Sequence, residues 1–151
     1  MIDERKIVDW FLIKNKAEKM LYPDRENMTQ LRLMKMMYYA QGVFLAVNDE
    51  PLFDDKIVHA NLGPMVESLH QEYCGCTKIP ESSHAMNNFK ELNNDSCVGI
   101  VLNAVYEKFA DTSTSDIINL THQQVPWEET KSGQELDPDK LKEYFKEYVI
   151  A

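Results

Sequence analysis

One segment in the first third of the chain is apolar in every direction around a helix. Thr29 is a residue type that caps helices, and apolar side chains follow at three- and four-residue steps to about Val47. Five of the six positions 34–39 are methionine or tyrosine: Met34, Met36, Met37, Tyr38 and Tyr39. These side chains cannot all face one core stripe. The segment is therefore either a central helix packed on several sides, or a helix whose outward side chains form an adaptable apolar surface for a partner.

Helical periodicity also predicts helices before and after this segment. Asp3 is the expected cap of a first helix, which ends near the turn residues Tyr22-Pro23-Asp24. Asn94 or Asp95 is the expected cap of a later helix, and Asp137-Pro138 is a strong cap and first-residue pair for a terminal one. The helices expected after residue 60 are 64–74, 95–109, 116–122 and 138–149.

The period changes between the second and third predicted helices. Residues 48–51 have turn chemistry, and the apolar runs 52–53 and 57–58 are too short for helices, so one or two short strands are expected. Gly63-Pro64 is expected to open the next helix, with proline at its first position. Residues 75–93 and 123–134 are expected to be surface loops. The predicted fold is mainly α: a single compact bundle of about six helices, with one or two short β-strands near residues 52–60.

Size and charge limit the classes of function. The 151 residues, 44% of them hydrophobic, are expected to form one domain over 1–151 that needs neither a metal nor a disulfide to fold. The net charge of −9 disfavours nucleic-acid binding. The acidic start of the chain is unlike a secretory signal, and the odd number of cysteines fits reduced thiols, so a cytoplasmic location is expected.

Residues that could support catalysis are scattered. His70, Cys74 and Cys76 are the best metal candidates, with Cys97 or His84 to complete a site, but the spacing is unlike paired zinc ligands. No thiol or serine lies in a nucleophile motif, and no phosphate-binding glycine loop occurs. The available carboxylates Glu67, Glu72, Glu128 and Glu129 are typical of a solvated face. We therefore expect no enzyme activity, no metal and no cofactor.

A second class of function is a DNA-associated regulator. The chain has one local cationic grouping, Arg32 and Lys35 with Lys14 and Lys16 on the preceding helix. Such residues serve either as DNA contacts or as helix-surface charges paired with neighbouring acids. The net acidity favours the second interpretation.

With these segments placed, the sequence resembles the SocA-like antitoxin family, also called the Panacea domain and often labelled phage-associated protein. The resemblance extends over nearly the whole chain and depends on the order and separation of four motifs. These motifs are 29–42, 51–53, 63–66 with Leu69 and Tyr73, and 120–122 followed by Pro126 and Trp127.

The resemblance implies a mainly helical domain without a cofactor, which neutralises a partner toxin by binding it. An acidic domain of this kind suits a basic toxin, because charge complementarity speeds encounter. The family-motif residues Lys35, His122, Pro126 and Trp127 are expected to be structural, with His122 and Trp127 docking the late loop onto the core. Tyr38, Tyr39, Gly63 and Pro64 are expected to lie near the partner surface.

Two positions depart from the family pattern. Ala60 stands where the family usually has tryptophan, and Leu62 where it usually has an aromatic residue. Loss of an aromatic anchor changes the preference for a partner. The apolar end of the chain, residues 148–151, either completes the last helix against the core or serves as a degradation signal, and the helical period favours the first interpretation.

Overall fold

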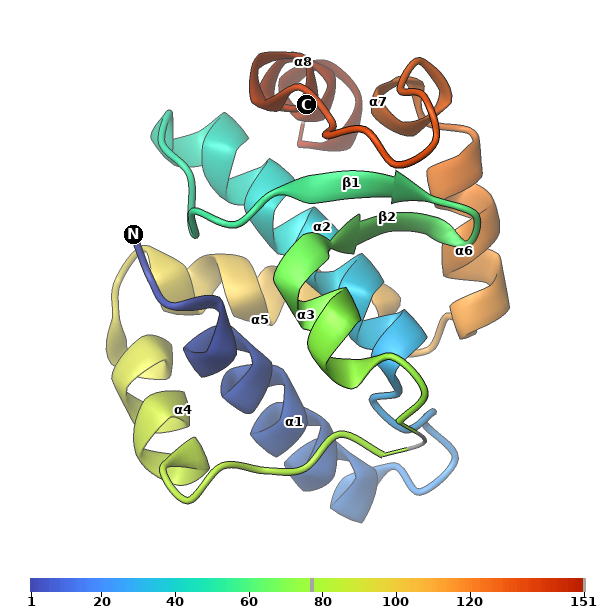
Figure 1. Ribbon diagram of the computed structural model, residues 1–151. Helices are drawn as coiled ribbons and strands as arrows, with labels where there is room; N and C mark the ends of the chain where they lie inside the picture. Colours follow the sequence, from blue (N-terminus) through green and yellow to red (C-terminus); the bar gives the residue numbers. More distant parts are fainter. Residues whose placement is uncertain (77, 151) are drawn as a thin grey trace.

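A single long helix is the centre of the fold. The computed structural model describes residues 1–76 and 78–150. Helix α2 (Gln30–Asn48) contacts helices on every side and one strand of the hairpin (Figure 1). Of its 19 residues, 14 are buried, including all the methionines and both tyrosines. The interpretation of this segment as a central helix is confirmed, and the expectation of an outward apolar surface on it is wrong.

Three helices pack together beside α2, and the first and the last of them contact it. Helix α1 (Glu4–Leu21) packs on α4 (Ala85–Asn94), which packs on α5 (Val98–Phe109). Asp3 caps α1 by accepting from the backbone N–H of Arg5 at 2.9 Å, as expected. The indole of Trp10 stacks on Phe89 with ring centroids 5.7 Å apart, which joins α1 to α4.

A two-stranded antiparallel hairpin crosses α2 (Figure 1). Strand β1 (Ile57–Ala60) pairs with β2 (Gly63–Val66), and Ala60 opposes Gly63 across the turn. Gly63 has φ 107°, which only glycine adopts readily. The expected helix entry at Gly63-Pro64 is therefore wrong: these residues open a strand, and α3 (Glu67–Tyr73) begins after it. All four residues of β2 are buried, so the strand lacks the polar alternation that would have identified it.

The outer edge of β1 is closed by a later segment of the chain. The backbone N–H of His59 donates to the Gln134 carbonyl at 2.9 Å, and the N–H of Gly133 donates to the His59 carbonyl at 2.9 Å. The N–H of Leu136 donates to the Ile57 carbonyl at 2.8 Å. These bonds satisfy backbone groups that an exposed edge strand would leave open.

The expected strand at Leu52-Phe53 is replaced by a side-chain contact. Gln41 on α2 accepts from the backbone N–H groups of Leu52 at 2.8 Å and Phe53 at 3.2 Å. Its amide nitrogen donates to the Phe53 carbonyl at 2.9 Å. The buried amide thus provides the hydrogen bonds that a neighbouring strand would provide. The prediction of short strands near residues 52–60 is confirmed for 57–60.

Two expected loops contain helices. Residues 85–94 form α4, because Ala85, Phe89 and Leu92 recur at helical spacing and pack inward. Residues Val125–Glu128 form the short helix α7. The described residues therefore hold eight α-helices in place of about six, and the predicted class, mainly α with short strands, is confirmed.

The C-terminal third completes the bundle beside the hairpin. Helix α6 (Thr114–His122) is capped by Ser113, and α8 (Pro138–Tyr144) by Asp137. A π-helical turn, η1 (Phe145–Val149), follows α8, and its Phe145 ring fills the space beside Gly42 on α2. Tyr148 is exposed and Val149 packs against the core, so only part of the chain end is buried, and Ala151 lies outside the described residues.

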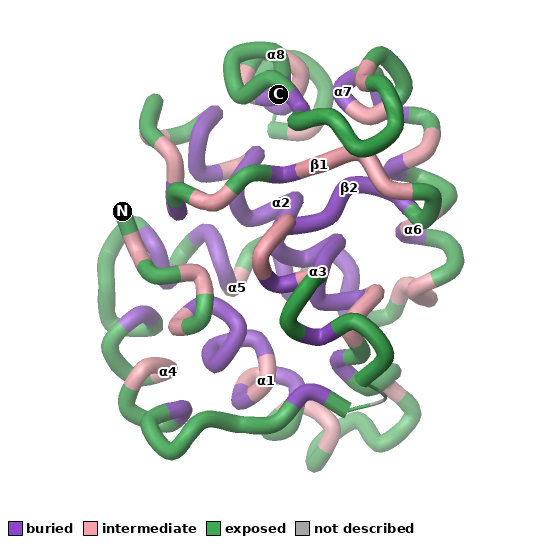
Figure 2. Tube along the Cα trace, viewed as in Figure 1, coloured by how far each residue is buried: buried purple, intermediate pink, exposed green. Residues whose placement is uncertain are grey.

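Burial follows this arrangement. Figure 2 shows α2 and β2 buried along their lengths, with exposed residues on the outer helices and loops. Within the described ranges, none of the helices combines the length and the apolar character needed to cross a bilayer.

Candidate functional site

The family-motif residue Lys35 lies inside the protein. Its side chain is fully buried, and its Nζ donates to the Pro64 carbonyl oxygen at 3.1 Å, which ties α2 to β2. A Cβ on Gly63 would lie 2.9 Å from the Lys35 Cε and 2.8 Å from the Thr121 hydroxyl oxygen. Glycine at position 63 therefore satisfies both the turn conformation and the close approach of Lys35 and Thr121.

Burial lowers the pKa of Lys35 to about 7, because the ammonium form loses its hydration there. Among the described residues, no carboxylate forms an ion pair with Lys35. The group is thus close to its titration midpoint at neutral pH, and its one hydrogen bond is to a backbone carbonyl. A core lysine of this kind makes stability sensitive to pH.

Trp127 docks α7 onto the hairpin. Its ring stacks on His59 of β1 at 4.1 Å between centroids and on His122 of α6 at 4.3 Å. Its indole N–H donates to the Ala60 carbonyl at 3.1 Å. The predicted contact, in which His122 and Trp127 fasten the late segment to the core, is present, with His59 as a third member that the sequence did not indicate. Pro126, the other motif residue here, is buried in the first turn of α7.

Tyr38 and Tyr39 are core residues. The Tyr38 hydroxyl donates to the Gln124 side-chain oxygen at 2.7 Å, and the Gln124 amide donates to the Tyr39 hydroxyl at 2.7 Å. Burial raises the pKa of Tyr38 well above its usual value and that of Tyr39 to about 12. The expected surface position of these rings is wrong, because the central helix is covered on the side they face.

Gly63 and Pro64 are buried as well. Both belong to β2, where α2 covers them and Lys35 contacts them. Their expected position near a partner surface is therefore wrong in the folded chain. The motif keeps its structural meaning, because it fixes the turn and accepts the lysine hydrogen bond.

The expected cationic grouping is dispersed. Arg32 is 3% exposed and donates to the Phe109 carbonyl at 2.6 Å and the Thr112 carbonyl at 2.8 Å, at the end of α5. Lys14 pairs with Glu18 on the same helix at 3.1 Å. With Arg32 and Lys35 both buried, the grouping offers no continuous basic surface for DNA.

The candidate thiols and imidazoles also lie apart. Within residues 1–76 and 78–150, no group of three or more histidine, cysteine, aspartate or glutamate side chains is arranged to hold a metal ion. The Nδ1 atom of His70 lies 3.0 Å from the Gln30 amide nitrogen. All three cysteines, Cys74, Cys76 and Cys97, are exposed free thiols.

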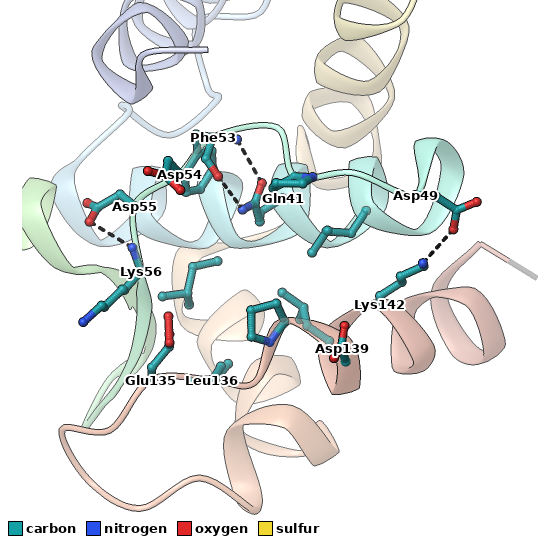
Figure 3. Close-up of a pocket in the computed structure, with 15 residues that line it drawn as sticks. Gln41, Asp49, Phe53, Asp54, Asp55, Lys56, Glu135, Leu136, Asp139 and Lys142 are labelled. Atoms are coloured by element: carbon teal, nitrogen blue, oxygen red, sulfur yellow. Dashed lines mark hydrogen bonds and ion pairs between the residues drawn. The ribbon is translucent and has the colours of Figure 1, made fainter. Parts of the chain in front are cut away.

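A groove of about 370 Å³ opens between the end of α2 and the start of α8 (Figure 3). One wall is the loop 49–57 that follows α2, and the other is the segment 135–142. Apolar side chains form much of its lining: Leu45, Pro51, Phe53, Ile57, Leu136, Pro138 and Leu141. The Gln41 amide beneath the groove holds residues 52–53 in place, so this wall is fixed to the central helix.

Carboxylates outnumber ammonium groups around the groove. Its lining contains five carboxylates, Asp49, Asp54, Asp55, Glu135 and Asp139, and two lysines, Lys56 and Lys142. Asp49 is already paired, with Lys142 at 2.8 Å and Lys146 at 3.0 Å. The hydrogen bonds from those lysines lower the pKa of Asp49 to about 2. This pair joins the end of α2 to α8 and closes one end of the groove.

The other carboxylates differ in how they are used. Asp55 accepts from the backbone N–H groups of Lys56 and Ser68, at 2.9 and 3.0 Å, and from the Ser68 hydroxyl. Asp54 and Glu135 are exposed on opposite walls, and neither forms an ion pair within the described part of the chain. The negative charge at Asp54 and Glu135 is therefore available to a ligand.

Sequence reasoning did not indicate this groove. The carboxylates considered from the sequence are Glu67, Glu72, Glu128 and Glu129, and none of them lines the groove. The only sequence signal was the recurrence of acids beside prolines at 49–55 and 135–139. The contact between these two distant segments depends on the tertiary fold.

The comparison with known families supports the sequence resemblance. A family model described as antitoxin SocA-like, Panacea domain, matches residues 33–128. No curated protein and no solved structure matches the chain. The matched range includes Lys35, the hairpin, the Trp127 stack and the first wall of the groove, whereas the second wall at 135–142 follows it.

Proposed function

This chain belongs to the family of SocA-like antitoxins with a Panacea domain, and we propose that it neutralises a partner toxin by binding it directly. The observation that carries this proposal is the family match over residues 33–128. The match includes the lysine, glycine-proline and tryptophan motifs whose contacts shape the fold. The proposal concerns a protein-binding module in the cytosol.

We propose binding in place of catalysis because the motif residues are engaged within the protein. Lys35 bonds to Pro64, Trp127 is held between two imidazoles, and Tyr38 and Tyr39 share the Gln124 amide. These contacts position helices and strands. The polar groups of the motif are thus part of the scaffold, and the exposed surface remains for the partner.

The charge of the chain indicates the chemistry of the partner. With 25 acidic and 16 basic residues, the surface attracts a basic protein over distances near the Debye length. Complementary charge raises the rate of encounter, and apolar contacts then set the lifetime of the complex. A basic toxin therefore fits the proposal, and a polyanion such as DNA does not.

Co-expression tests the proposed function. The product of the adjacent reading frame is expressed from an inducible promoter, with and without this chain, and growth is followed together with co-purification of the two proteins. Restored growth with a stable complex is the expected result. A neighbour that stops growth equally with and without the chain contradicts the proposal.

A further inference from the structure

We propose that the groove between residues 49–57 and 135–142 binds a basic segment of the partner protein, with an arginine or lysine side chain between Asp54 and Glu135. This inference rests on the proposed function and adds to it the place and chemistry of the contact. The occupant is a peptide segment with alternating cationic and apolar side chains. The groove offers both kinds of contact in one place (Figure 3).

The rim provides the charge complementarity. Asp54 and Glu135 lie on opposite walls, both are exposed, and neither is engaged in an ion pair in the described ranges. Asp49, by contrast, is neutralised by Lys142 and Lys146. A guanidinium or ammonium group entering between the walls would therefore meet two carboxylates that the fold itself leaves unpaired.

The lining provides the apolar contact. Phe53, Ile57 and Leu136 are each at most 5% exposed and make the floor rigid, whereas the more exposed Pro51 and Pro138 present apolar surface to a ligand. A volume of about 370 Å³ accommodates a few side chains and is too small for a folded element. The stem of a lysine or arginine, together with a neighbouring apolar side chain, can cover this floor while its charged end reaches the rim.

The backbone around the groove limits how the segment can bind. The backbone groups on the outer edge of β1 already form hydrogen bonds with residues 133–136. A partner cannot extend the sheet there without displacing that segment. The partner is therefore recognised by its side chains, which makes the sequence of the segment decisive.

One wall of the groove lies beyond the part of the chain that the family model matches. Residues 49–57 fall within 33–128, and residues 135–142 follow it. The first wall of the groove therefore belongs to the part of the chain that the family model matches, and the second wall does not. Glu135 thus adjusts the preference for a partner without altering the scaffold.

A defined peptide tests the site without any toxin. A short synthetic peptide of alternating arginine and leucine is titrated into the full chain, and binding is followed by calorimetry and by amide resonances. Expected are saturable binding that salt weakens, and shifts concentrated at residues 45–57 and 135–142. Absence of saturable binding, or shifts centred elsewhere, overturns the proposal.

Matched charge reversals separate the groove from the net charge. The groove variant carries two substitutions, Asp54→Lys and Glu135→Lys. The control variant carries Asp24→Lys and Glu107→Lys, which make the same change in net charge at exposed residues away from the groove. The groove variant is expected to bind the peptide about tenfold more weakly, because two attractions become repulsions. The control variant is expected to bind within about twofold of the wild type. Equal weakening of both variants overturns the proposal.

The toxin provides the second arm of the test. If the wild-type chain neither rescues growth nor captures the product of the adjacent reading frame, the proposed function is contradicted. Binding of the peptide at the groove is measured independently of that result. Capture by the wild type and the control variant, with about tenfold weaker capture by the groove variant, supports the groove as the docking site. Equal capture by all three proteins overturns it.

Discussion

The Nζ atom of Lys35 lies 3.1 Å from the carbonyl oxygen of Pro64, and this hydrogen bond joins the central helix to the hairpin inside the core. A buried ammonium group with one neutral partner is unfavourable, and the lysine pKa falls to about 7 for that reason. The contact that organises the family motif thus also makes the fold sensitive to pH.

We predict that stability rises with pH from about 7 to 9.5. The folded pKa of Lys35 lies below the unfolded value of 10.5, so the unfolded chain binds more protons between these values. The increase by pH 9.5 is about 3 kcal/mol at 1.36 kcal/mol per pH unit. Urea unfolding across this range measures it. Lys35→Met is expected to remove this dependence of stability on pH, whereas the control Lys90→Met, at an exposed lysine, is expected to retain it. Identical stability profiles for the two variants would refute the assignment of the pH dependence to Lys35.

Gly63→Ala is expected to destabilise the fold by at least about 2 kcal/mol. Alanine is unfavourable at the positive φ of this position, and its Cβ would crowd the side chains of Lys35 and Thr121. Gly133→Ala is the matched control, because Gly133 has φ 79° but nothing within 4 Å of an added Cβ. It should lose only about 1 kcal/mol. Chemical denaturation of both variants checks the difference, and equal losses would show that the close approach is unimportant.

Trp127→Ala is expected to destabilise the fold by about 2–3 kcal/mol, because it removes a partly buried ring from between His59 and His122. Trp127→Phe keeps a stacking ring and loses the hydrogen bond to the Ala60 carbonyl, so its loss should be about 1 kcal/mol. Thermal unfolding orders the three proteins. Trp127→Ala as stable as Trp127→Phe would mean that the stack does not hold α7.

The Asp49 carboxyl is expected to titrate near pH 2, because Lys142 and Lys146 stabilise its ionised form. Its favourable contribution is present above the unfolded pKa of 3.8 and is lost as the pH falls toward 2. Carboxyl NMR titration measures the value. Replacing both lysines, Lys142→Met and Lys146→Met, should return the pKa of Asp49 toward 3.8, and an unchanged low value would contradict the pairing.

The sequence predicted the features that depend on local patterns. The expected caps Asp3, Thr29 and Asp137 are all used, since capping needs only neighbouring backbone N–H groups. The central position of α2 followed from its all-round apolar surface. The spacing of Ala85, Phe89 and Leu92 is also typical of a helix and indicates α4. The loop was expected there because the segment is polar in composition.

The features that the sequence did not predict depend on contacts between distant segments. Gly63-Pro64 became a strand because α2 covers it on one side and β1 pairs on another. Tyr38 and Tyr39 were expected outside, but Gln124, 85 residues from Tyr39, meets both hydroxyls in the core. The groove needs residues 49–57 and 135–142 together, and no local pattern encodes that proximity.

Calorimetric titration of the purified chain with the purified product of the adjacent reading frame, in an inactive form, tests the central claim most directly. Neutralisation by direct contact predicts saturable binding with a defined stoichiometry, which weakens as salt is raised. Growth rescue in cells without any measurable binding between the purified proteins would contradict the account.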